Sequence, residues 1–381
     1  MPPFDMSLVQ RGARLRRSPF HEATQRYWPR GFTVYNHMLF PTNYADFEEE
    51  YWHLLEHVTL WDVAVERNVE VTGPDGFRFA QLLTCRDLSK CAVGQGKYAP
   101  IIAPDGGILN DPVMLRLGED HFWFALADSD VLLYAKGLAA YAGMDVELAE
   151  PDVSPLQLQG PRSKEVMRDL FGPGILDLRY YHFVETELDG IPLVVTRTGW
   201  TSEIGYEIYL RDGRRGTELW DRIMEAGRPY LIRPTGPSDI RRIEGGILNW
   251  GADFTAEHNP YEVGLERLVD LDMPGHFVGR EALRRIAAEG VRRRLVGVEI
   301  EGERLDFNAT EWAVLADGEP VGEVTSAIWS PRLRKNIGYA WVPVERSATG
   351  NRLIVETGAG AREATVVAMP FVDPQKRIPI S

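Results

Sequence analysis

The stretch TGWTSEIGYEIYL (residues 198–210) brings an aromatic residue and a carboxylate close together in the sequence. Trp200 follows Gly199 where a predicted hairpin ends, and Glu207 lies on the strand that comes next. Such a pair can hold a flat heterocycle, because the aromatic ring stacks on its face while the carboxylate accepts hydrogen bonds from its N–H groups. A core tryptophan beside a surface acid would explain the same residues, so the pair alone does not identify a site.

The segments on either side of this stretch alternate between helical and strand patterns. In chain order we expect a helix at 163–172, a hairpin at 181–200 with an Asp189-Gly190 turn, a strand at 205–210 and a helix at 216–227. These segments together predict one α+β unit.

A similar succession occupies residues 68–160, where strand, helix, two strands, helix and strand follow one another. The PDGG sequence at 104–107 is the predicted turn between two of these strands. Further towards the N-terminus we expect an extended segment at 31–41 and a helix that ends near residue 58. The order of elements predicts a second unit, with a mixed sheet and its helices on one face.

Beyond about residue 275 the sequence consists of short strands punctuated by glycine, which predicts a small antiparallel barrel or sandwich. The expected fold is therefore α+β with three parts. Two of them are α/β units with mixed or antiparallel sheets, and the third is a C-terminal β-barrel.

Composition and charge narrow the classes of function. With 381 residues the chain is longer than one hydrophobic core usually fills. Its net charge of -14 disfavours nucleic acid and anionic membranes as partners. No run of eighteen apolar residues and no apolar leader is present, so we expect a cytoplasmic protein. The two cysteines, Cys85 and Cys91, are too few for a disulfide framework or a cysteine-rich zinc site.

Two short motifs could suggest other chemistry. His53, Glu56 and His57 spell H-x-x-E-H, a zinc-protease pattern, but zinc needs a third ligand that the sequence does not reveal. A half-buried helix with hydrogen-bonded histidines is the simpler interpretation. GQGKYA (94–99) lacks both the spacing and the Ser or Thr of a phosphate-binding loop. We therefore expect neither a metal nor a nucleotide site here.

The opening stretch resembles the T-G-Y-T-G-E-x-G-[FY]-E-I signature of the glycine-cleavage T proteins, the folate-dependent aminomethyltransferases. Other family blocks follow in the same order along the chain: LQGPRS (158–163), SDIRRIEGGILNWGAD (238–253), PYEVGLERLVDLD (260–272), FVGREAL (277–283) and GEVTSAIWSP (322–331). The resemblance implies a three-domain, cloverleaf-like fold with tetrahydrofolate in a central channel.

The same resemblance implies limits for the three domains. A folate-binding first domain would comprise residues 1–56 and 152–255, and an α+β second domain residues 57–151. Residues 256–276 would connect to the C-terminal barrel at 277–381.

Within this superfamily the chain is most similar to the dimethylsulfoniopropionate demethylases. The blocks that carry this likeness are RRSPF (16–20), GFTVYNHMLFPT (31–42), HLLEHVTLWDVAVERNVEV (53–71), GGILNDPV (106–113), ADSDVLLY (127–134) and EPDVSPLQLQGP (150–161). These enzymes move a methyl group from a sulfonium zwitterion to tetrahydrofolate, so the resemblance implies a small-molecule methyl donor and tetrahydrofolate as the methyl acceptor.

Asn110 and Asp111 are the predicted catalytic pair. In the aminomethyltransferases the position of Asn110 resembles the first acid of an Asp-Asp pair, which assists a protonated aminomethyl group. Methyl displacement from a sulfonium releases a neutral thioether and needs no proton at sulfur. An amide at position 110 can bind the pterin without a charge that would favour protonated N5. Asn110 thus favours methyl over aminomethyl transfer, unless it is merely a tolerated turn residue.

The resemblance also suggests the other folate contacts. Glu207 would accept hydrogen bonds from the pterin, Trp200 would replace the family's usual tyrosine, and Tyr98 would line the channel. Arg242 would pair with a folate carboxylate or serve as a structural partner of Glu244.

The methyl donor requires a second set of residues. An aromatic face attracts a sulfonium, which makes Tyr35 and Trp200 candidates. Its carboxylate requires a cation, for which Arg16 or Arg17 is the candidate. Trp329 stands where those demethylases tend to have histidine, and is a further candidate for substrate binding.

Several alternatives stay open at this stage. The donor could be a betaine-type amine or a methoxy compound, because the departures from the demethylase pattern fall in loops expected to face the channel. The chain could instead be an aminomethyltransferase acting on a lipoyl carrier, or a folate-binding or iron–sulfur-assembly relative without methyl transfer. We expect a monomer or a homodimer.

Overall fold

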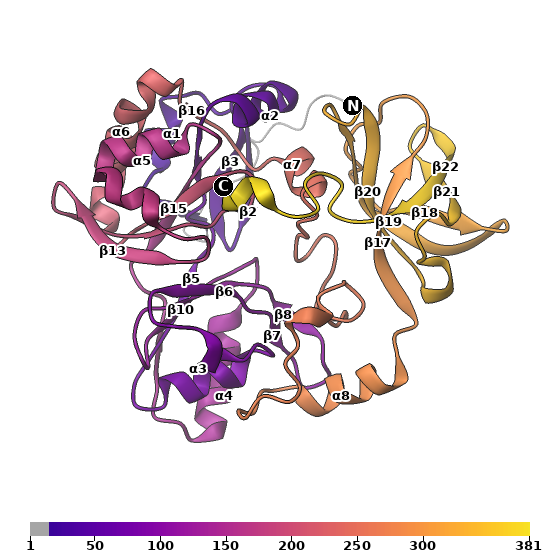
Figure 1. Ribbon diagram of the computed structural model, residues 1–381, viewed down its shortest axis with the longest axis horizontal. Helices are drawn as coiled ribbons and strands as arrows, with labels where there is room; N and C mark the ends of the chain where they lie inside the picture. Colours follow the sequence, from indigo (N-terminus) through magenta and orange to yellow (C-terminus); the bar gives the residue numbers. More distant parts are fainter. Residues whose placement is uncertain (1–14) are drawn as a thin grey trace.

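The computed structural model describes residues 15–381 and shows three lobes around the centre of the molecule (Figure 1). A six-stranded sheet forms the first lobe, in the spatial order β13-β14-β15-β12-β4-β16. Its neighbours are antiparallel except β16 and β4, which run parallel. The strands are β4 (Thr59–Asp62), β12 (Ser154–Gln159), β13 (Phe183–Leu188), β14 (Ile191–Thr196), β15 (Gly205–Leu210) and β16 (Arg233–Pro234).

Helices and a small second sheet complete this lobe. The helices are α1 (His21–Gln25), α2 (Phe47–Glu56), α5 (Ser163–Phe171), α6 (Gly216–Gly227) and α7 (Asp239–Glu244). The small sheet has the order β1-β3-β2, with β1 (Arg16–Arg17), β2 (Gly31–Tyr35) and β3 (Met38–Asn43). The extended segment predicted at 31–41 is thus a hairpin. Asn36 and His37 turn the chain with φ values of 48° and 62°, as a two-residue type I′ turn requires.

The predicted hairpin at 181–200 is confirmed. Strands β13 and β14 pair from Phe183↔Thr196 to Leu188↔Ile191, and the turn between them has positive φ at Asp189 (50°) and Gly190 (73°). Local sequence sufficed for this prediction, because Asp-Gly accepts the left-handed conformation of a type I′ turn.

A five-stranded sheet forms the second lobe, with order β11-β5-β10-β9-β6 and antiparallel pairing throughout. The sheet expected to be mixed is therefore antiparallel. The elements are β5 (Asn68–Thr72), α3 (Gly76–Leu83), β6 (Gln95–Tyr98), β9 (Val113–Arg116), β10 (Phe122–Ala125), α4 (Val131–Ala142) and β11 (Glu147–Ala149). The pair β7 (Ile101–Ile102) and β8 (Ile108–Asn110) flanks this sheet, with the predicted turn at 104–107 between them.

Two boundaries differ from the sequence pattern. The last strand of the 68–160 succession divides: β11 joins the five-stranded sheet and β12 the six-stranded one. Pro151 separates them, and a proline cannot donate to a sheet ladder. Strand β4 begins after the predicted domain limit at residue 57, yet it pairs with β12 of the first lobe. The domain limits otherwise stay a prediction.

The C-terminal lobe is a closed barrel in the order β17-β20-β19-β18-β21-β22, as predicted. Its strands are β17 (Arg293–Ile300), β18 (Trp312–Ala316), β19 (Glu319–Ser330), β20 (Lys335–Pro343), β21 (Arg352–Thr357) and β22 (Gly360–Val367). Helix α8 (Arg280–Glu289) precedes the barrel. After the barrel the chain returns to the middle of the molecule and ends in α9 (Arg377–Ile380) (Figure 1).

Side-chain packing joins the lobes. Trp123 and Phe183 belong to a buried apolar cluster shared by the two sheets, and Tyr339 belongs to one shared by the barrel and α7. Arg197 donates from Nη1 to the carbonyl of Pro379 (2.8 Å) and from Nη2 to Ser381 (2.7 Å), which ties the C-terminal segment to the first lobe. Contacts in the middle of the molecule thus connect each lobe to at least one of the others.

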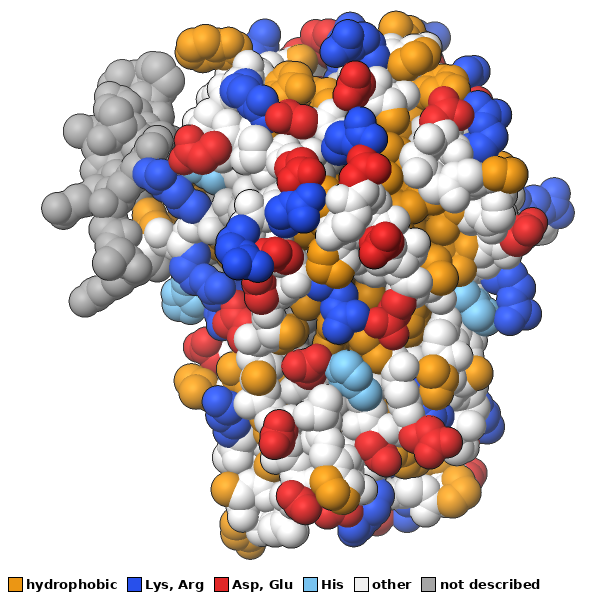
Figure 2. Space-filling view, turned by 90° about the vertical axis from the view of Figure 1, so that its left-hand side faces the viewer, with side chains coloured by type: hydrophobic (Ala, Val, Ile, Leu, Met, Phe, Trp, Pro, Cys, Tyr) orange, Lys and Arg blue, Asp and Glu red, His pale blue; other side chains and the backbone are white. Residues whose placement is uncertain are grey.

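Neither the charge of the face in Figure 2 nor the helices that the structure describes point to a membrane. On the face shown in Figure 2, basic and acidic side chains are interspersed, so that this face presents no extended field of one sign. Within residues 15–381, every helix is too short or too polar to cross a bilayer.

Candidate active site

Glu207 is buried on β15, in the middle of the six-stranded sheet, with 4% of its surface exposed. Its carboxylate accepts hydrogen bonds from Thr198 Oγ1 (2.5 Å), Gln157 Nε2 (2.8 Å), Tyr209 OH (3.0 Å) and Thr196 Oγ1 (3.3 Å). Burial raises its pKa, and these donors oppose that rise. Three of the four bonds reach Oε2, so Oε1 keeps room for one further donor.

Trp200 adjoins this carboxylate through Gln157. The Gln157 side chain donates to Glu207 from Nε2 and accepts from the Trp200 backbone N–H at Oε1 (3.4 Å). Gln157 lies directly opposite Glu207 in the β12–β15 register. Sequence reasoning missed Gln157, although it lies within a quoted family block, because the pairing of distant strands is what brings it to Glu207.

Two signature glycines make this arrangement possible. A Cβ at Gly199 or Gly205 would fall inside van der Waals contact with the Gln159 side chain. Gln159 itself accepts from Thr201 Oγ1 (2.7 Å) and donates to the carbonyls of Thr198 and Tyr206. The glycines therefore allow a buried glutamine to fix the loop between β14 and β15.

Asp111 lies just after β8 and accepts a hydrogen bond from the Tyr98 hydroxyl at 2.7 Å. Burial raises the pKa of Asp111 to about 7, while the Tyr98 hydrogen bond acts in the opposite direction. Near neutral pH this carboxyl can therefore either hold or accept a proton.

Asn110 is fully buried, and its side chain binds the chain itself. Its Nδ2 donates to the carbonyl of Ala127 (3.0 Å) and to Ser129 Oγ (2.8 Å), while its Oδ1 accepts from the Ala127 N–H (3.0 Å). A carboxylate could not make the two donations. With both amide hydrogens used internally, Asn110 has no donor left for a pterin, so a donated hydrogen bond from Asn110 to the folate does not fit this geometry.

Asn36 extends the same network towards the hairpin of Tyr35. Its Nδ2 donates to the carbonyls of Val65 (2.9 Å) and Ala127 (3.2 Å). The side-chain amides of Asn36 and Asn110 thus both donate to the carbonyl of Ala127. This shared contact fixes the backbone beside Tyr35, which precedes Asn36, and beside Asp111, which follows Asn110. Burial raises the pKa of Tyr35, and the negative charges of Asp111 and Glu66 raise it further.

Comparison with known proteins assigns this arrangement to a family. The model of the GCVT N-terminal domain matches residues 8–273, and that of the glycine cleavage T-protein C-terminal barrel domain matches residues 293–373. The chain belongs to the glycine-cleavage T-protein family. The predicted family is confirmed.

Relatives of this T-protein family member span nearly its whole length. Dimethylsulfoniopropionate demethylase DmdA of Ruegeria pomeroyi is 40% identical over 361 residues, which cover 95% of this chain and 98% of that protein. An aminomethyltransferase of Symbiobacterium thermophilum is 32% identical over 368 residues, covering 94% and 97%. The crystal structure of glycine cleavage system aminomethyltransferase T from Bartonella henselae has a TM-score of 0.85 at 23% identity, covering 94% and 98%. This last likeness confirms the predicted fold class.

Arg242 of this T-protein family member lies at the junction between α7 and the barrel. It donates to Asp239 (2.6 Å), Asp253 (2.8 Å) and Ser326 Oγ (2.9 Å), and its guanidinium lies 5.9 Å from the centre of the Trp200 ring. The suggested structural pairing of Arg242 with Glu244 is wrong. Its neighbour Arg241 approaches Glu244 (3.6 Å) and binds Glu203 (2.8 Å) instead.

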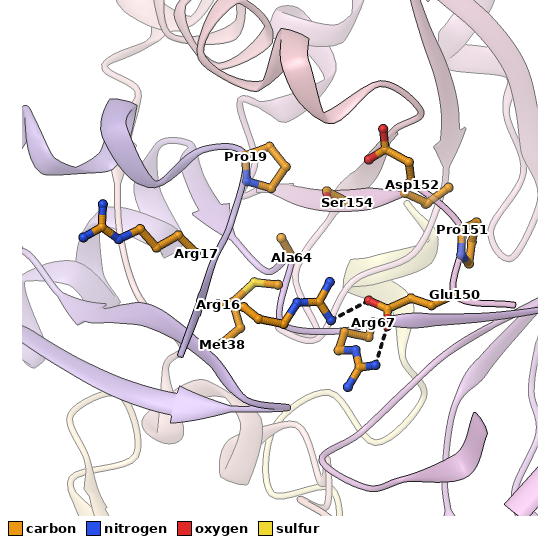
Figure 3. A pocket seen from close by; sticks show the side chains of 11 residues that line it. Arg16, Arg17, Pro19, Met38, Ala64, Arg67, Glu150, Pro151, Asp152 and Ser154 are labelled. Atoms are coloured by element: carbon orange, nitrogen blue, oxygen red, sulfur yellow. Dashed lines mark hydrogen bonds and ion pairs between the residues drawn. The ribbon is translucent and has the colours of Figure 1, made fainter. Parts of the chain in front are cut away.

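Arg16 and Arg17 lie at a different pocket, of about 300 Å³ (Figure 3). Arg16 donates to Glu150 (2.6 Å), which also accepts from Arg67, and Arg17 points away from both (Figure 3). None of the side chains around Glu207 or Asp111 lines this pocket. The donor-carboxylate role expected of the two arginines therefore does not fit their position.

Trp329 does not face the Asp253 network either. On β19, Ser326 Oγ donates to Asp253 and Ser330 Oγ to Glu244. Alternation along the strand puts Trp329 on the other face, with Ala327 of the barrel core. The substrate contact expected of Trp329 lacks support from this orientation.

The H-x-x-E-H helix makes ordinary packing contacts. His53 Nε2 lies 2.7 Å from the carbonyl of Leu231, so that nitrogen carries the proton and is not free for a metal. The part of the chain that the structure describes holds no group of three His, Cys, Asp or Glu side chains placed to bind a metal ion.

Proposed function

We propose that this T-protein family member transfers a methyl group from a sulfonium such as dimethylsulfoniopropionate to N5 of tetrahydrofolate, giving 5-methyltetrahydrofolate. The observation that carries the proposal is the full-length likeness to a dimethylsulfoniopropionate demethylase, at 40% identity. The aminomethyltransferases match at 33% identity or below.

Glu207, Trp200 and Tyr98 are the proposed folate contacts. Oε1 of Glu207 has room for one N–H donor of a pterin, and the partly exposed Trp200 ring can stack on its face. The hydroxyl groups of Thr196, Thr198 and Tyr209 can rotate to release further acceptor capacity. These features make the site suitable for tetrahydrofolate, which supplies the nucleophilic N5 when bound.

Asp111 is the proposed base. As the methyl carbon bonds to N5, the C–S bond breaks, its electron pair stays on sulfur, and the N5 proton has to leave. With a pKa of about 7, the Asp111 carboxylate can accept that proton. Tyr98 holds the carboxylate in place through its 2.7 Å hydrogen bond. No acid is required at the leaving thioether, because it is neutral.

The test is a comparison of methyl donors. The protein and tetrahydrofolate are incubated separately with dimethylsulfoniopropionate, a betaine, a methoxy compound and an aminomethylated lipoyl carrier, and the folate products are identified by mass. We expect 5-methyltetrahydrofolate from the sulfonium. Its formation only from another donor would replace the sulfonium in the proposal, and methylenetetrahydrofolate from the lipoyl carrier alone would make the protein an aminomethyltransferase.

The folate contact has its own variant. We expect Glu207→Gln to weaken tetrahydrofolate binding by roughly tenfold or more, because it exchanges an acceptor oxygen for a competing donor. Glu187→Gln on the exposed side of β13 is the matched control. Binding is measured by calorimetric titration, and an unchanged affinity in Glu207→Gln would remove Glu207 from the site.

The remaining elements of the proposal are a monomeric or homodimeric protein that acts in the cytoplasm without nucleic acid. Light scattering after size-exclusion chromatography gives the oligomeric state, and higher assemblies would contradict this part of the proposal.

A further inference from the structure

Glu66 is a partly buried acid in the turn between β4 and β5. For its carboxylate the structure records no hydrogen bond and no ion pair with any residue from 15 to 381. Burial raises its pKa, and the nearby charges of Glu207 and Asp111 raise it further. Glu66 therefore lies within electrostatic range of the two acids of the candidate active site, and residues 15–381 provide no recorded hydrogen-bond or ion-pair partner for its carboxylate.

The backbone around Glu66 is fixed in that position. The Glu66 N–H donates to the carbonyl of Val63 (2.9 Å), and Asn36 Nδ2 donates to the carbonyl of Val65 (2.9 Å). Because Asn36 and Asn110 both bind the carbonyl of Ala127, one hydrogen-bonded network holds the Glu66 turn and the Asp111 strand together. The fold thus joins the turn that carries Glu66 to the strand that ends before Asp111.

The carboxylates of Glu207 and Asp111, unlike that of Glu66, have hydrogen-bond partners. Glu207 accepts four hydrogen bonds from neighbouring side chains, and Asp111 accepts one from Tyr98. The arginine next to Glu66 in the chain and the arginine beside Trp200 also have carboxylate partners already. Arg67 pairs with Glu150, and Arg242 pairs with Asp239 and Asp253. Within the described part of the chain, Glu66 is therefore the one of these three acids whose carboxylate has neither a recorded hydrogen bond nor an ion pair.

We propose that Glu66 is the specificity-determining residue that selects a cationic methyl donor, whose positive sulfur it faces. A half-buried carboxylate without a partner is costly, and a ligand cation removes that cost. Tyr35 precedes Asn36, whose side chain binds the carbonyl of Val65 next to Glu66, so its ring can add an aromatic face to the same cation. The acids would also repel the donor's own carboxylate, which orients the sulfonium inwards. This inference rests on the proposed function, because it assumes that the methyl donor enters the site of Asp111 and Glu207.

The test separates charge from shape. The probes are the zwitterion 3-(trimethylammonio)propanoate, whose cationic head mimics that of a methylated donor, and 4,4-dimethylpentanoate, its isostere with an uncharged quaternary carbon in place of the cationic nitrogen. Their dissociation constants are measured by calorimetry in the presence of tetrahydrofolate. We expect the wild-type protein to prefer the cation by roughly tenfold or more, equivalent to about 1.4 kcal/mol.

Glu66→Gln is the decisive variant, because it keeps the shape of the side chain and removes its charge. We expect the preference for the cation to fall to about one, with tetrahydrofolate affinity unchanged and thermal stability equal or higher, since repulsion between acids is relieved. Glu66→Asp retains the charge and should retain most of the preference. Glu289→Gln, at an exposed and unpaired position of α8, is the matched control.

Two results would overturn the inference: equal binding of both probes by the wild-type protein, or an undiminished preference in Glu66→Gln. Failure of the proposed function gives a different pattern. A preference for the cation that depends on Glu66, without 5-methyltetrahydrofolate from any donor, would retain the cation site and reject methyl transfer.

Discussion

At the scale of single residues, Asn110 uses its amide in a way that a carboxylate cannot reproduce. It donates twice and accepts once within the 127–129 segment, and it lies next to Asp111. The amide therefore has two effects: it positions the segment that carries Asp111, and it keeps a second negative charge away from that acid. The absence of a negative charge at position 110 therefore affects the proton affinity of Asp111, rather than a direct contact between Asn110 and folate.

Asn110→Asp tests both effects. Losing the two donations is expected to lower the free energy of unfolding by about 1 to 3 kcal/mol. The added negative charge should raise the pKa of Asp111, so that the base is protonated at a higher pH. The acidic limb of the kcat profile then moves to higher pH, and activity is lost most at low pH. Thermal unfolding and a pH–rate profile measure the two effects; a destabilised variant with an unshifted profile would refute the electrostatic part.

Asp111 should also make stability depend on pH. Its pKa is about 7 in the folded protein and 3.8 as the ordinary value, so the folded state binds more protons between these limits. Stability contributed by the protonated group is present below about 3.8 and lost as pH rises to about 7. Asp62 acts in the same direction, since burial raises its pKa to about 6.

We expect Asp111→Asn to remove part of this dependence, gaining stability relative to wild type as pH rises from about 4 to about 7. The gain at pH 8 should be of the order of a few kcal/mol, at about 1.4 kcal/mol for each unit of pKa difference. Urea unfolding at several pH values measures it. A difference between the two proteins that stays constant across this range would contradict the raised pKa.

At the scale of elements, the loop between β14 and β15 depends on two glycines packed against Gln159. We expect Gly205→Ala to destabilise the protein by about 1 to 3 kcal/mol through overpacking, and to weaken tetrahydrofolate binding because Glu207 follows on the same strand. Gly137→Ala is the matched control. Gly137 lies within α4 with open space around it, so alanine there should stabilise by roughly 0.5 to 1 kcal/mol. If both variants behaved alike, Gln159 would not be the reason for the glycine.

At the scale of the whole molecule, sequence patterns predicted what neighbouring residues determine. The Asp189-Gly190 hairpin, helices α2 to α6 and the strand-rich barrel follow from local spacing and turn chemistry, whereas α8 (Arg280–Glu289) was not predicted. The division of residues 146–160 between two sheets does not, because it depends on which distant strands have free edges. Signature blocks indicated Glu207 and Asp111, and Glu66 also lies within a quoted block (53–71), but nothing in that block separates it from the other acids there. An acid in a turn looks like a solvated residue until the fold places it beside two others.

A buried ion pair between Asp253 and Arg242 is one of the contacts that hold α7 against the barrel. Asp253 binds Arg242 and accepts from Ser326 Oγ and Thr325 Oγ1, and its own carbonyl accepts from Trp341. We expect Asp253→Ala to cost about 3 to 5 kcal/mol of unfolding free energy, because it removes the fully buried partner of a buried guanidinium and leaves only the partly exposed Asp239. Arg242 lies against Trp200, so tetrahydrofolate affinity should fall as well.

Asp317→Ala provides the comparison within the same barrel, since Asp317 pairs with Arg346 at the exposed surface. Removing such a pair should change stability by less than about 1 kcal/mol and leave folate binding intact. Calorimetric unfolding of the two variants distinguishes the contributions. If Asp253→Ala kept both its melting temperature and its folate affinity, the ion pair would be neither needed to hold α7 against the barrel nor the support of Trp200, and the contacts of Ser330 and Tyr339 with α7 would suffice to join the lobes.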